Sequence, residues 1–249
     1  MKNISIISLL LMLSFSVRAQ STDATDAPAK GFIGVSGGFA MPNGPITKIA
    51  YNDNTAGFAG NGSTFGVEGA YFFCKYLGVG GKVSYTSFGI GTLGLDSLSA
   101  GYRNSFDVDR VTTTITGAYS MWTFMPGIYL RYPIGSKLNI TADVLLGFTS
   151  TRTPTISVAV EDGGVEDGSF IQQSCTANAF GYSAAIGASY KLCSRFAVTL
   201  KANYLSCTPD FYMDNINRPV NVGRLVTEYN EPINVLSFSL GVAYMLGKK

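Results

Sequence analysis

Histidine is absent from this 249-residue sequence, and only 14% of its residues are charged. Soluble domains average about 25% charged residues, so much of the surface that such a domain shows to water is missing. Long apolar runs are missing too: after residue 20 no stretch approaches the ~18 apolar residues of a membrane-spanning helix. The mean hydropathy of +0.21 is nevertheless that of an apolar chain. These absences favour a protein that crosses a membrane with strands.

The N-terminal residues have the features of an export signal. Lys2 precedes an apolar stretch from Ile4 to Val17, and Val17-Arg18-Ala19 offers a signal peptidase site. We expect a signal peptide over 1–19, a flexible N-terminal segment over 20–30 and a single domain over 31–249. A short membrane anchor is the alternative for the first segment. Removal of Lys2 and Arg18 leaves equal numbers of basic and acidic residues, so the charge indicates no nucleic-acid partner.

From Gly31 onward, apolar and polar residues alternate with the period of two that strands show. Eight segments follow this pattern: 32–40, 64–73, 77–87, 119–132, 138–148, 178–192, 196–206 and 234–246. Short and long connections alternate between them, as in outer-membrane barrels. The sequence predicts an all-β fold, an eight-stranded antiparallel up-and-down transmembrane β-barrel with short periplasmic turns and long extracellular loops. It would be integral to the cell outer membrane, with both termini periplasmic.

A soluble barrel would show the same alternation with its apolar face inward, so the character of the polar face decides between the two. That face is mostly Gly, Ser, Ala and Thr, which suits a narrow lumen better than a surface in water. Aromatic residues gather at both ends of the apolar face. Near the short turns these are Phe73, Tyr132, Tyr190, Phe196 and Tyr244, and near the long connections they are Phe39, Phe65, Trp122, Phe148, Phe180 and Tyr204. Two such girdles are typical of the two interfaces of a membrane.

Three stretches carry a family resemblance: GSTFGVEGAYFFCKYLGVGGKVSY, FMPGIYLRYPIGSKLNITADVLLG and the closing INVLSFSLGVAYMLG. They resemble the small eight-stranded outer-membrane β-barrel proteins, the PorT-like and OmpA-transmembrane-like group. The resemblance implies fold, location and three partners: outer-membrane lipids, lipopolysaccharide and the outer-membrane assembly machinery. It implies no cofactor, no particular activity and no particular ligand for the loops. Such barrels often end on an aromatic residue that the assembly machinery reads, a role that Tyr244 would fill here.

Charged residues on the predicted polar faces are the candidate site. They are Glu68, Lys82, Arg131, Asp143, Lys191 and Lys201. Counting back from the short turn after Phe73 places Glu68 opposite Lys82, within cross-strand reach of ~5 Å. Because an eight-stranded barrel is only just wide enough to be filled by side chains, we expect this charge cluster to plug the lumen. A hydrated pair of little energetic weight is the alternative.

Two weaker candidates lie in the long connections. Glu161, Asp162, Glu166 and Asp167 supply four carboxylates on a Gly-rich turn, the type of ligand that Ca²⁺ prefers, although their spacing fits no standard loop. A solvated loop tip is the simpler interpretation. Cys175 and Cys207 fall near the long-loop ends of neighbouring strands, about three residues out of register, so a disulfide between them is conceivable in an exported protein.

Two local motifs carry structural expectations. Gly89-Ile-Gly-Thr-Leu-Gly94 matches a dinucleotide-binding fingerprint and follows a strand. We expect no helix and no parallel strand after it, hence a flexible loop and no nucleotide site. Pro126 cannot donate to a strand ladder, so we expect a β-bulge near Met125 and Pro126.

The lack of histidine also limits the possible functions. Barrels that hydrolyse or transfer acyl chains, or cleave peptides, typically use a histidine base, so we expect no enzyme. The favoured hypothesis is a non-enzymatic barrel that acts through its extracellular loops in adhesion, recognition or envelope structure. The alternatives are a passage for small or apolar solutes, with a lateral opening near Pro126, and an accessory component of a secretion system.

Overall fold

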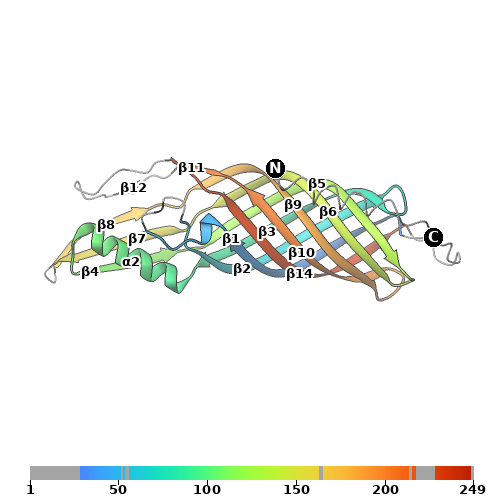
Figure 1. Cartoon of the computed structure of the whole chain (residues 1–249), viewed down its shortest axis with the longest axis horizontal. Coiled ribbons are helices and arrows are strands. Elements are labelled where there is room, and N and C mark those ends of the chain that lie inside the picture. The colour runs from blue at the N-terminus through green and yellow to red at the C-terminus, as the bar shows by residue number, and fades with distance from the viewer. Residues whose placement is uncertain are drawn as a thin grey trace, which may run out of the picture.

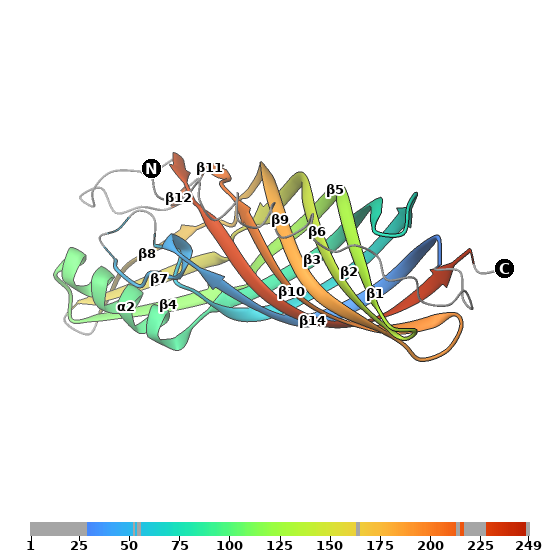
Figure 2. The ribbon, with the colours of Figure 1, turned by 45° about the vertical axis from the view of Figure 1, so that its right-hand side comes forward.

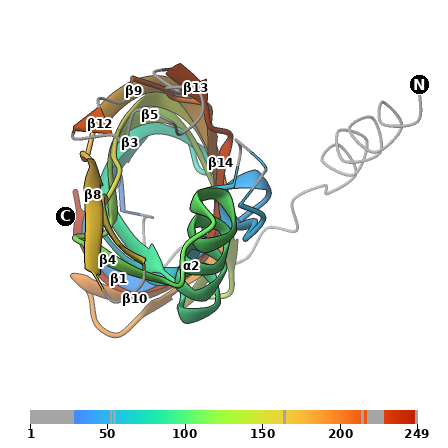
Figure 3. The ribbon, with the colours of Figure 1, turned by 90° about the vertical axis from the view of Figure 1, so that its left-hand side faces the viewer.

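The computed structural model describes residues 29–51, 53, 56–162, 165–212, 215–216 and 228–247. The predicted signal peptide therefore lies outside the described residues. Eight long strands form one closed antiparallel barrel in the order β1-β14-β10-β9-β6-β5-β3-β2 (Figures 1 and 3). Their bounds are Gly31–Asn43 (β1), Ala59–Phe72 (β2), Leu77–Ile90 (β3), Tyr119–Ile134 (β5), Leu138–Arg152 (β6), Thr176–Lys191 (β9), Phe196–Cys207 (β10) and Ile233–Leu246 (β14). These strands confirm the eight predicted segments, most of them lengthened at the long-loop end.

The barrel closes where its first and last strands meet. β1 pairs with β14 over its whole length, from Gly31 opposite Leu246 to Asn43 opposite Asn234. Both termini of the barrel consequently lie at the end that carries the short turns. Closure gives each of the eight strands two neighbours and leaves no open edge, which is what a strand structure needs inside a bilayer.

Side chains alternate across the barrel wall in a sense opposite to that of a soluble protein. Large apolar residues are exposed on the outside, with Phe148 at 66% and Leu146 at 53%. Polar side chains such as Thr149 and Asp143 on the same strand are buried inside. The outward band is the surface that a bilayer would cover, and the predicted aromatic residues lie at its two ends.

The β-bulge expected at Pro126 is not formed. The register of β5 against β6 is the same on both sides of it, with Phe124 opposite Phe148 and Gly127 opposite Leu145. Only the pairing of Met125 and Pro126 with β6 is missing, while both residues still pair with β3. Pro126 therefore removes local ladder contacts without inserting an extra residue, and the inward and outward assignment stays regular through β5.

Beyond the barrel, three long connections contribute to a separate structure at the long-loop end, which we call the extension (Figure 2). It consists of α2 and a four-stranded sheet in the order β12-β8-β7-β4. The bounds are Thr92–Phe106 (α2), Arg110–Thr116 (β4), Thr155–Asp162 (β7), Val165–Gln172 (β8) and Asn215–Ile216 (β12). Smaller elements lie nearby: the 3-10 turn η1 at Pro45–Thr47, and the pair β11 (Asp210–Tyr212) and β13 (Glu228–Asn230).

The extension corrects the prediction of a flexible loop after the glycine motif. α2 begins at Thr92, inside Gly89–Gly94, and ends at Phe106, followed by the C-cap residue Asp107 in a left-handed conformation. The strand that follows α2 pairs antiparallel with β7, so the parallel unit of a dinucleotide-binding fold is not formed. Gly94 is a packing position here, since a Cβ on it would lie 3.0 Å from Cβ of Phe58.

The extension also has an apolar core of its own. Leu98 of α2 packs with Ile156, Val158 and Val160 of β7, and Phe58 joins them beside the barrel rim. Their apolar side chains point inward, as in a soluble domain. None of the described helices is long and apolar enough to cross a membrane.

Candidate functional site

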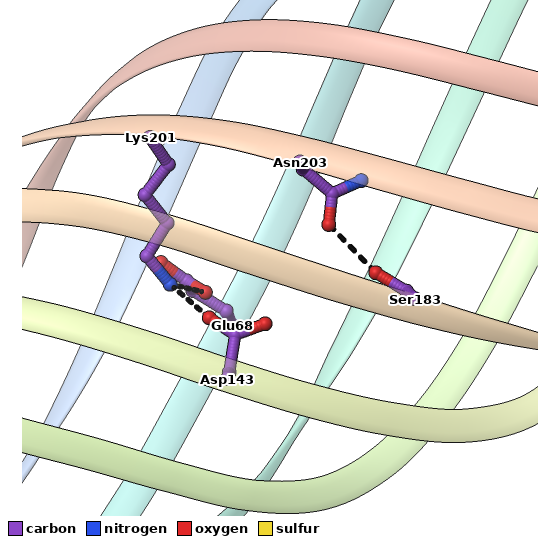
Figure 4. A network of polar contacts seen from close by, with 5 residues as sticks. All are labelled: Glu68, Asp143, Ser183, Lys201 and Asn203. Carbon is purple, nitrogen blue, oxygen red and sulfur yellow. Dashed lines mark hydrogen bonds and ion pairs between the residues drawn. The ribbon is translucent and has the colours of Figure 1, made fainter. Parts of the chain in front are cut away.

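Three of the six predicted charged residues meet in the middle of the lumen (Figure 4). The Lys201 ammonium on β10 lies 2.6 Å from Oε2 of Glu68 on β2 and 3.0 Å from Oδ2 of Asp143 on β6. All three side chains are at most 8% exposed. One cation therefore bridges two carboxylates that project from well-separated strands, and we call these three residues the lumen triad.

Local sequence makes room for the long Lys201 side chain. Its neighbours on the adjoining strands are Gly187 and Ser239, both small. A Cβ at position 187 would lie only 2.6 Å from Cγ of Lys201, so that position must lack a side chain. The ammonium also lies 5.3 Å from the ring centroid of the buried Tyr129, a further favourable contact for a cation.

The predicted partner of Glu68 is corrected in one respect. Lys82 does lie directly opposite Glu68 in the ladder, which confirms the predicted register. The ion pair, however, is made by Lys201, and Lys82 has no carboxylate within ion-pair distance among the described residues. The reason is geometric: an ammonium that crosses the lumen satisfies Glu68 and Asp143 together, whereas only Glu68 lies opposite Lys82 on a neighbouring strand.

The other two predicted residues lie nearer the short turns. Nη1 of Arg131 donates to the Ala29 carbonyl at 2.9 Å, and its guanidinium lies 3.9 Å from the ring centroid of Phe72. Lys191 is the last residue of β9, where its backbone N–H donates to Lys137. These two basic residues lie toward the short-turn end and are not part of the triad.

Neutral polar pairs fill much of the remaining lumen. Ser183 donates to Oδ1 of Asn203 at 2.6 Å, as Figure 4 also shows. The hydroxyls of Ser84 and Thr123 are 2.6 Å apart. The cavity lined by Glu68, Arg131 and Lys201 measures about 30 Å³, which is room for about two water molecules. The described side chains thus leave only a small space at this level of the barrel.

A buried acid at the long-loop mouth was missed by the sequence reasoning. Glu231, between β13 and β14, is 2% exposed, and its Oε1 has no hydrogen-bond partner among the described residues. Burial raises its pKa to about 8, with nearby Asp53 adding to the shift and Lys48 opposing it. Burial also raises the pKa of the nearby Tyr229 phenol. Only tertiary packing creates this site, so no local sequence signal could have revealed it.

The acidic turn of the extension is only partly described. Glu161 lies 3.5 Å from the Arg110 guanidinium across the β4–β7 ladder, and Asp162 is exposed. The side chains of Glu166 and Asp167 lie outside the described residues. No group of three or more potential metal ligands occurs in the part of the chain that the structure describes.

The disulfide considered between Cys175 and Cys207 is contradicted by the strand register. Cys207 lies opposite Gly181, whereas Cys175 precedes β9 and its carbonyl accepts from the backbone N–H of Thr153, just after β6. Six residues along β9 separate the two positions, about 20 Å at the rise of a strand. That is far beyond the reach of a disulfide, and both thiols are free.

Comparison with solved structures gives small outer-membrane barrels. Neisserial surface protein A is 11% identical, with 88% of this chain and 98% of that chain covered and a TM-score of 0.43. Ail, the attachment invasion locus protein of Yersinia pestis, is 13% identical over 88% and 99% of the chains, with a TM-score of 0.43. OprG from Pseudomonas aeruginosa is 13% identical over 87% and 96%, with a TM-score of 0.45.

Another similar structure is the outer membrane protease OmpT from Escherichia coli. It is 10% identical, covers 91% of this chain and 100% of its own, and has a TM-score of 0.40. No curated protein sequence matches this chain. A family model described as the outer membrane protein beta-barrel domain matches residues 7–245, nearly the whole sequence. The chain therefore belongs to the outer membrane protein beta-barrel domain family.

Proposed function

We propose that this protein is a closed, non-enzymatic outer-membrane anchor that presents its extension as a recognition surface outside the cell. The observation that carries the proposal is the contrast between a lumen crossed by the buried Lys201 triad and an extension with its own apolar core. A conducting pore needs an open lumen, whereas a display scaffold needs a rigid structure at its outer end. In this arrangement the short turns and both termini face the periplasm.

The sheet of the extension offers a suitable surface. Thr112, Thr114 and Thr116 alternate along β4 and are exposed on the face away from the apolar core. Ser157 of β7 lies opposite Thr114 on the same face. Rows of hydroxyl groups on a flat strand surface suit hydrogen bonding to a polar partner such as a saccharide. The ligand itself is left open in this proposal.

A loop-replacement experiment tests the role of the extension. Residues 91–118 and 153–175 would each be replaced by a short turn, which removes α2, β4, β7 and β8 but leaves the barrel strands. We expect the variant to insert and to keep the gel shift between heated and unheated samples, because loop length contributes little to a membrane barrel. Cells that display it should lose binding to glycan-coated or matrix-coated surfaces. Unchanged binding, measured beside cells without the protein, would contradict the proposal.

Solute passage through the wall is a second candidate, favoured by one observation. The missing β6 pairing of Met125 and Pro126 leaves a local break in the ladder between β5 and β6. A lateral opening there would let apolar molecules pass without a continuous lumen. Replacing Pro126 with valine would restore the missing donor, so reduced uptake of an apolar dye into proteoliposomes would support passage. Equal uptake by both proteins would exclude it.

A further inference from the structure

The outer wall over β3, β5, β6 and β9 has a graded surface near the long-loop end. The register aligns its outward residues in three successive rows, about 7 Å apart along the strands. The innermost row holds Val83, Phe124, Phe148 and Phe180, the next holds Tyr85, Trp122, Ser150 and Asn178, and the outermost holds Ser87, Ser120, Arg152 and Thr176. The wall thus changes from apolar to polar to charged within three rows.

A groove is set into this gradient. It measures about 590 Å³ and is lined by Val83, Trp122, Thr123, Phe124, Phe148, Thr149, Ser150 and Asn178. Its shape follows from the rows: Trp122 packs on Tyr85 at 5.0 Å between ring centroids, and next to it Ser150 and Asn178 are small. The floor is held by Phe148, whose ring meets that of Phe180 at 5.6 Å.

Arg152 stands directly above the groove and is unusual for its position. It is the only charged residue on the outward faces of the eight described barrel strands. Its Nη2 donates to Ser174 Oγ at 3.1 Å, and among the described residues no carboxylate lies within ion-pair distance of it. Most of its five N–H donors remain available, and a planar guanidinium suits a phosphate group.

We propose that this wall binds one phosphorylated glycolipid of the outer leaflet. An acyl chain lies in the groove beside Trp122, sugar hydroxyls meet Ser150 and Asn178, and a phosphate group rests on Arg152. The apolar-to-cationic order of the rows matches the order of chain, sugar and phosphate in such a lipid. The inference depends on the membrane position of the barrel and on the proposed outward orientation of the long-loop end, and is independent of what the extension recognises.

Trp122 is the only tryptophan of the chain and is exposed on the outer wall, so its fluorescence reports on the groove and on the lipid beside it. The protein would be reconstituted in phosphatidylcholine with brominated chains, which quench tryptophan on contact, and lipid A with ordinary chains would be added. We expect quenching to be relieved at about one tenth of the mole fraction that ordinary phosphatidylcholine requires, since an arginine–phosphate contact is worth about tenfold in affinity. Because lipid A is present in both leaflets, the result does not depend on orientation.

Two variants separate the parts of the site. Arg152→Gln should remove the tenfold preference while leaving the gel shift of a folded barrel unchanged, and Arg110→Gln in the extension is the matched control that should keep it. Ser150→Phe should fill the groove and abolish the preference, while brominated chains around the barrel still quench the exposed Trp122. Lipid A without phosphate groups should behave as phosphatidylcholine does.

Three outcomes would overturn the proposal. The first is equal relief of quenching by lipid A and by ordinary phosphatidylcholine. The second is an unchanged preference in a folded Arg152→Gln variant. The third is a preference for phosphatidylglycerol as strong as that for lipid A, which would reduce the site to general attraction of anionic lipid.

Discussion

The barrel and the extension bury opposite kinds of side chain: the barrel buries polar side chains in its lumen, and the extension buries apolar ones. On the barrel wall Leu146 and Phe148 face outward, while Asp143 and Thr149 of the same strand are buried. In the extension Val158 and Leu98 are buried, while the threonines of β4 are exposed. The same period-two alternation therefore serves two environments, lipid and water. Which side is apolar follows from what covers the strand, and not from the alternation itself.

The largest effect should come from breaking the polar interior of the barrel. Replacing Lys201 with methionine leaves the Glu68 and Asp143 carboxylates buried without their cation, so we expect a loss of about 3–5 kcal/mol in the free energy of unfolding. The triple variant Glu68→Gln, Lys201→Met, Asp143→Asn should recover most of that loss. Denaturant unfolding in lipid bilayers measures both. If the triple variant were the less stable of the two, the triad would not be acting through charge compensation.

A control within the lumen sharpens this test. Lys82→Met removes a cation that makes no ion pair with a described carboxylate. Its cost should therefore be clearly smaller than that of Lys201→Met, although Lys82 is the residue opposite Glu68 in the ladder. Equal losses for the two variants would show that ladder position, and not the observed contacts, determines the energetics.

A substitution in the apolar core of the extension should destabilise the extension while the barrel stays folded. Leu98→Ala creates a cavity beneath α2, and such substitutions cost about 2–5 kcal/mol. Because Leu98 is not part of the buried core of the barrel, we expect faster proteolysis of α2 and β4 while the heat-dependent gel shift of the barrel is unchanged. Limited proteolysis followed by mass spectrometry locates the cuts. Loss of the gel shift would mean that the two regions fold as one unit.

The mouth between the two regions should respond to pH through Glu231. Its pKa rises from an ordinary 4.5 to about 8 in the folded state, so the folded protein binds more protons than the unfolded chain between these values. The contribution of Glu231 to local stability is then fully present below about pH 4.5 and is lost as the pH rises toward 8. Glu231→Gln should remove this dependence.

Hydrogen exchange around β13 and the start of β14 measures the effect, with wild type and Glu231→Gln compared at each pH. That comparison cancels the intrinsic pH dependence of exchange. The variant should be better protected than wild type at pH 9, and the two should be alike at pH 4. A constant difference across this range would contradict the assignment to Glu231.

The smallest expected effect is a difference in reactivity among the four thiols, whose labelling reports on their exposure. Cys193 is exposed in a short turn, and backbone hydrogen bonds from Arg195 and Phe196 lower its pKa, so it should react fastest with a maleimide at pH 7. Cys207 is buried and should react slowest. Cys175→Ser should leave migration on a non-reducing gel unchanged. A shift in that variant would show that a disulfide had formed.

The barrel could be predicted because its pattern is local. Alternation along each strand, aromatic residues at strand ends and short turns near Cys74, Pro133 and Cys193 are all legible in the sequence, and the register of Glu68 against Lys82 follows from one turn. The meeting of Lys201 with Glu68 and Asp143 could not be predicted in this way. It depends on how strands from different parts of the sequence are staggered around a closed barrel, and no neighbouring residues encode that stagger.

The extension was harder to predict for a related reason. The run Thr92–Phe106 contains glycine and several serines, and these weaken a helical signal that packing on β4 and β7 overrides. In β4 three exposed threonines replace the charged residues that would mark a water-facing strand. Glu231 lies beyond any sequence pattern because its environment comes from β5, β13 and the segment near Lys48.

The seam between β1 and β14 has a consequence for how the molecule is made. Gly31 and Leu246, which pair there, are about 215 residues apart in the chain. The ring cannot close until the last strand has been delivered, and such distant pairing slows folding because the intervening chain must first give up its freedom. Until the last strand pairs, the apolar faces of the other seven strands are not part of a closed barrel. The protein must therefore be kept from aggregating along its whole route to the membrane, and truncation of β14 should block assembly more completely than loss of the entire extension.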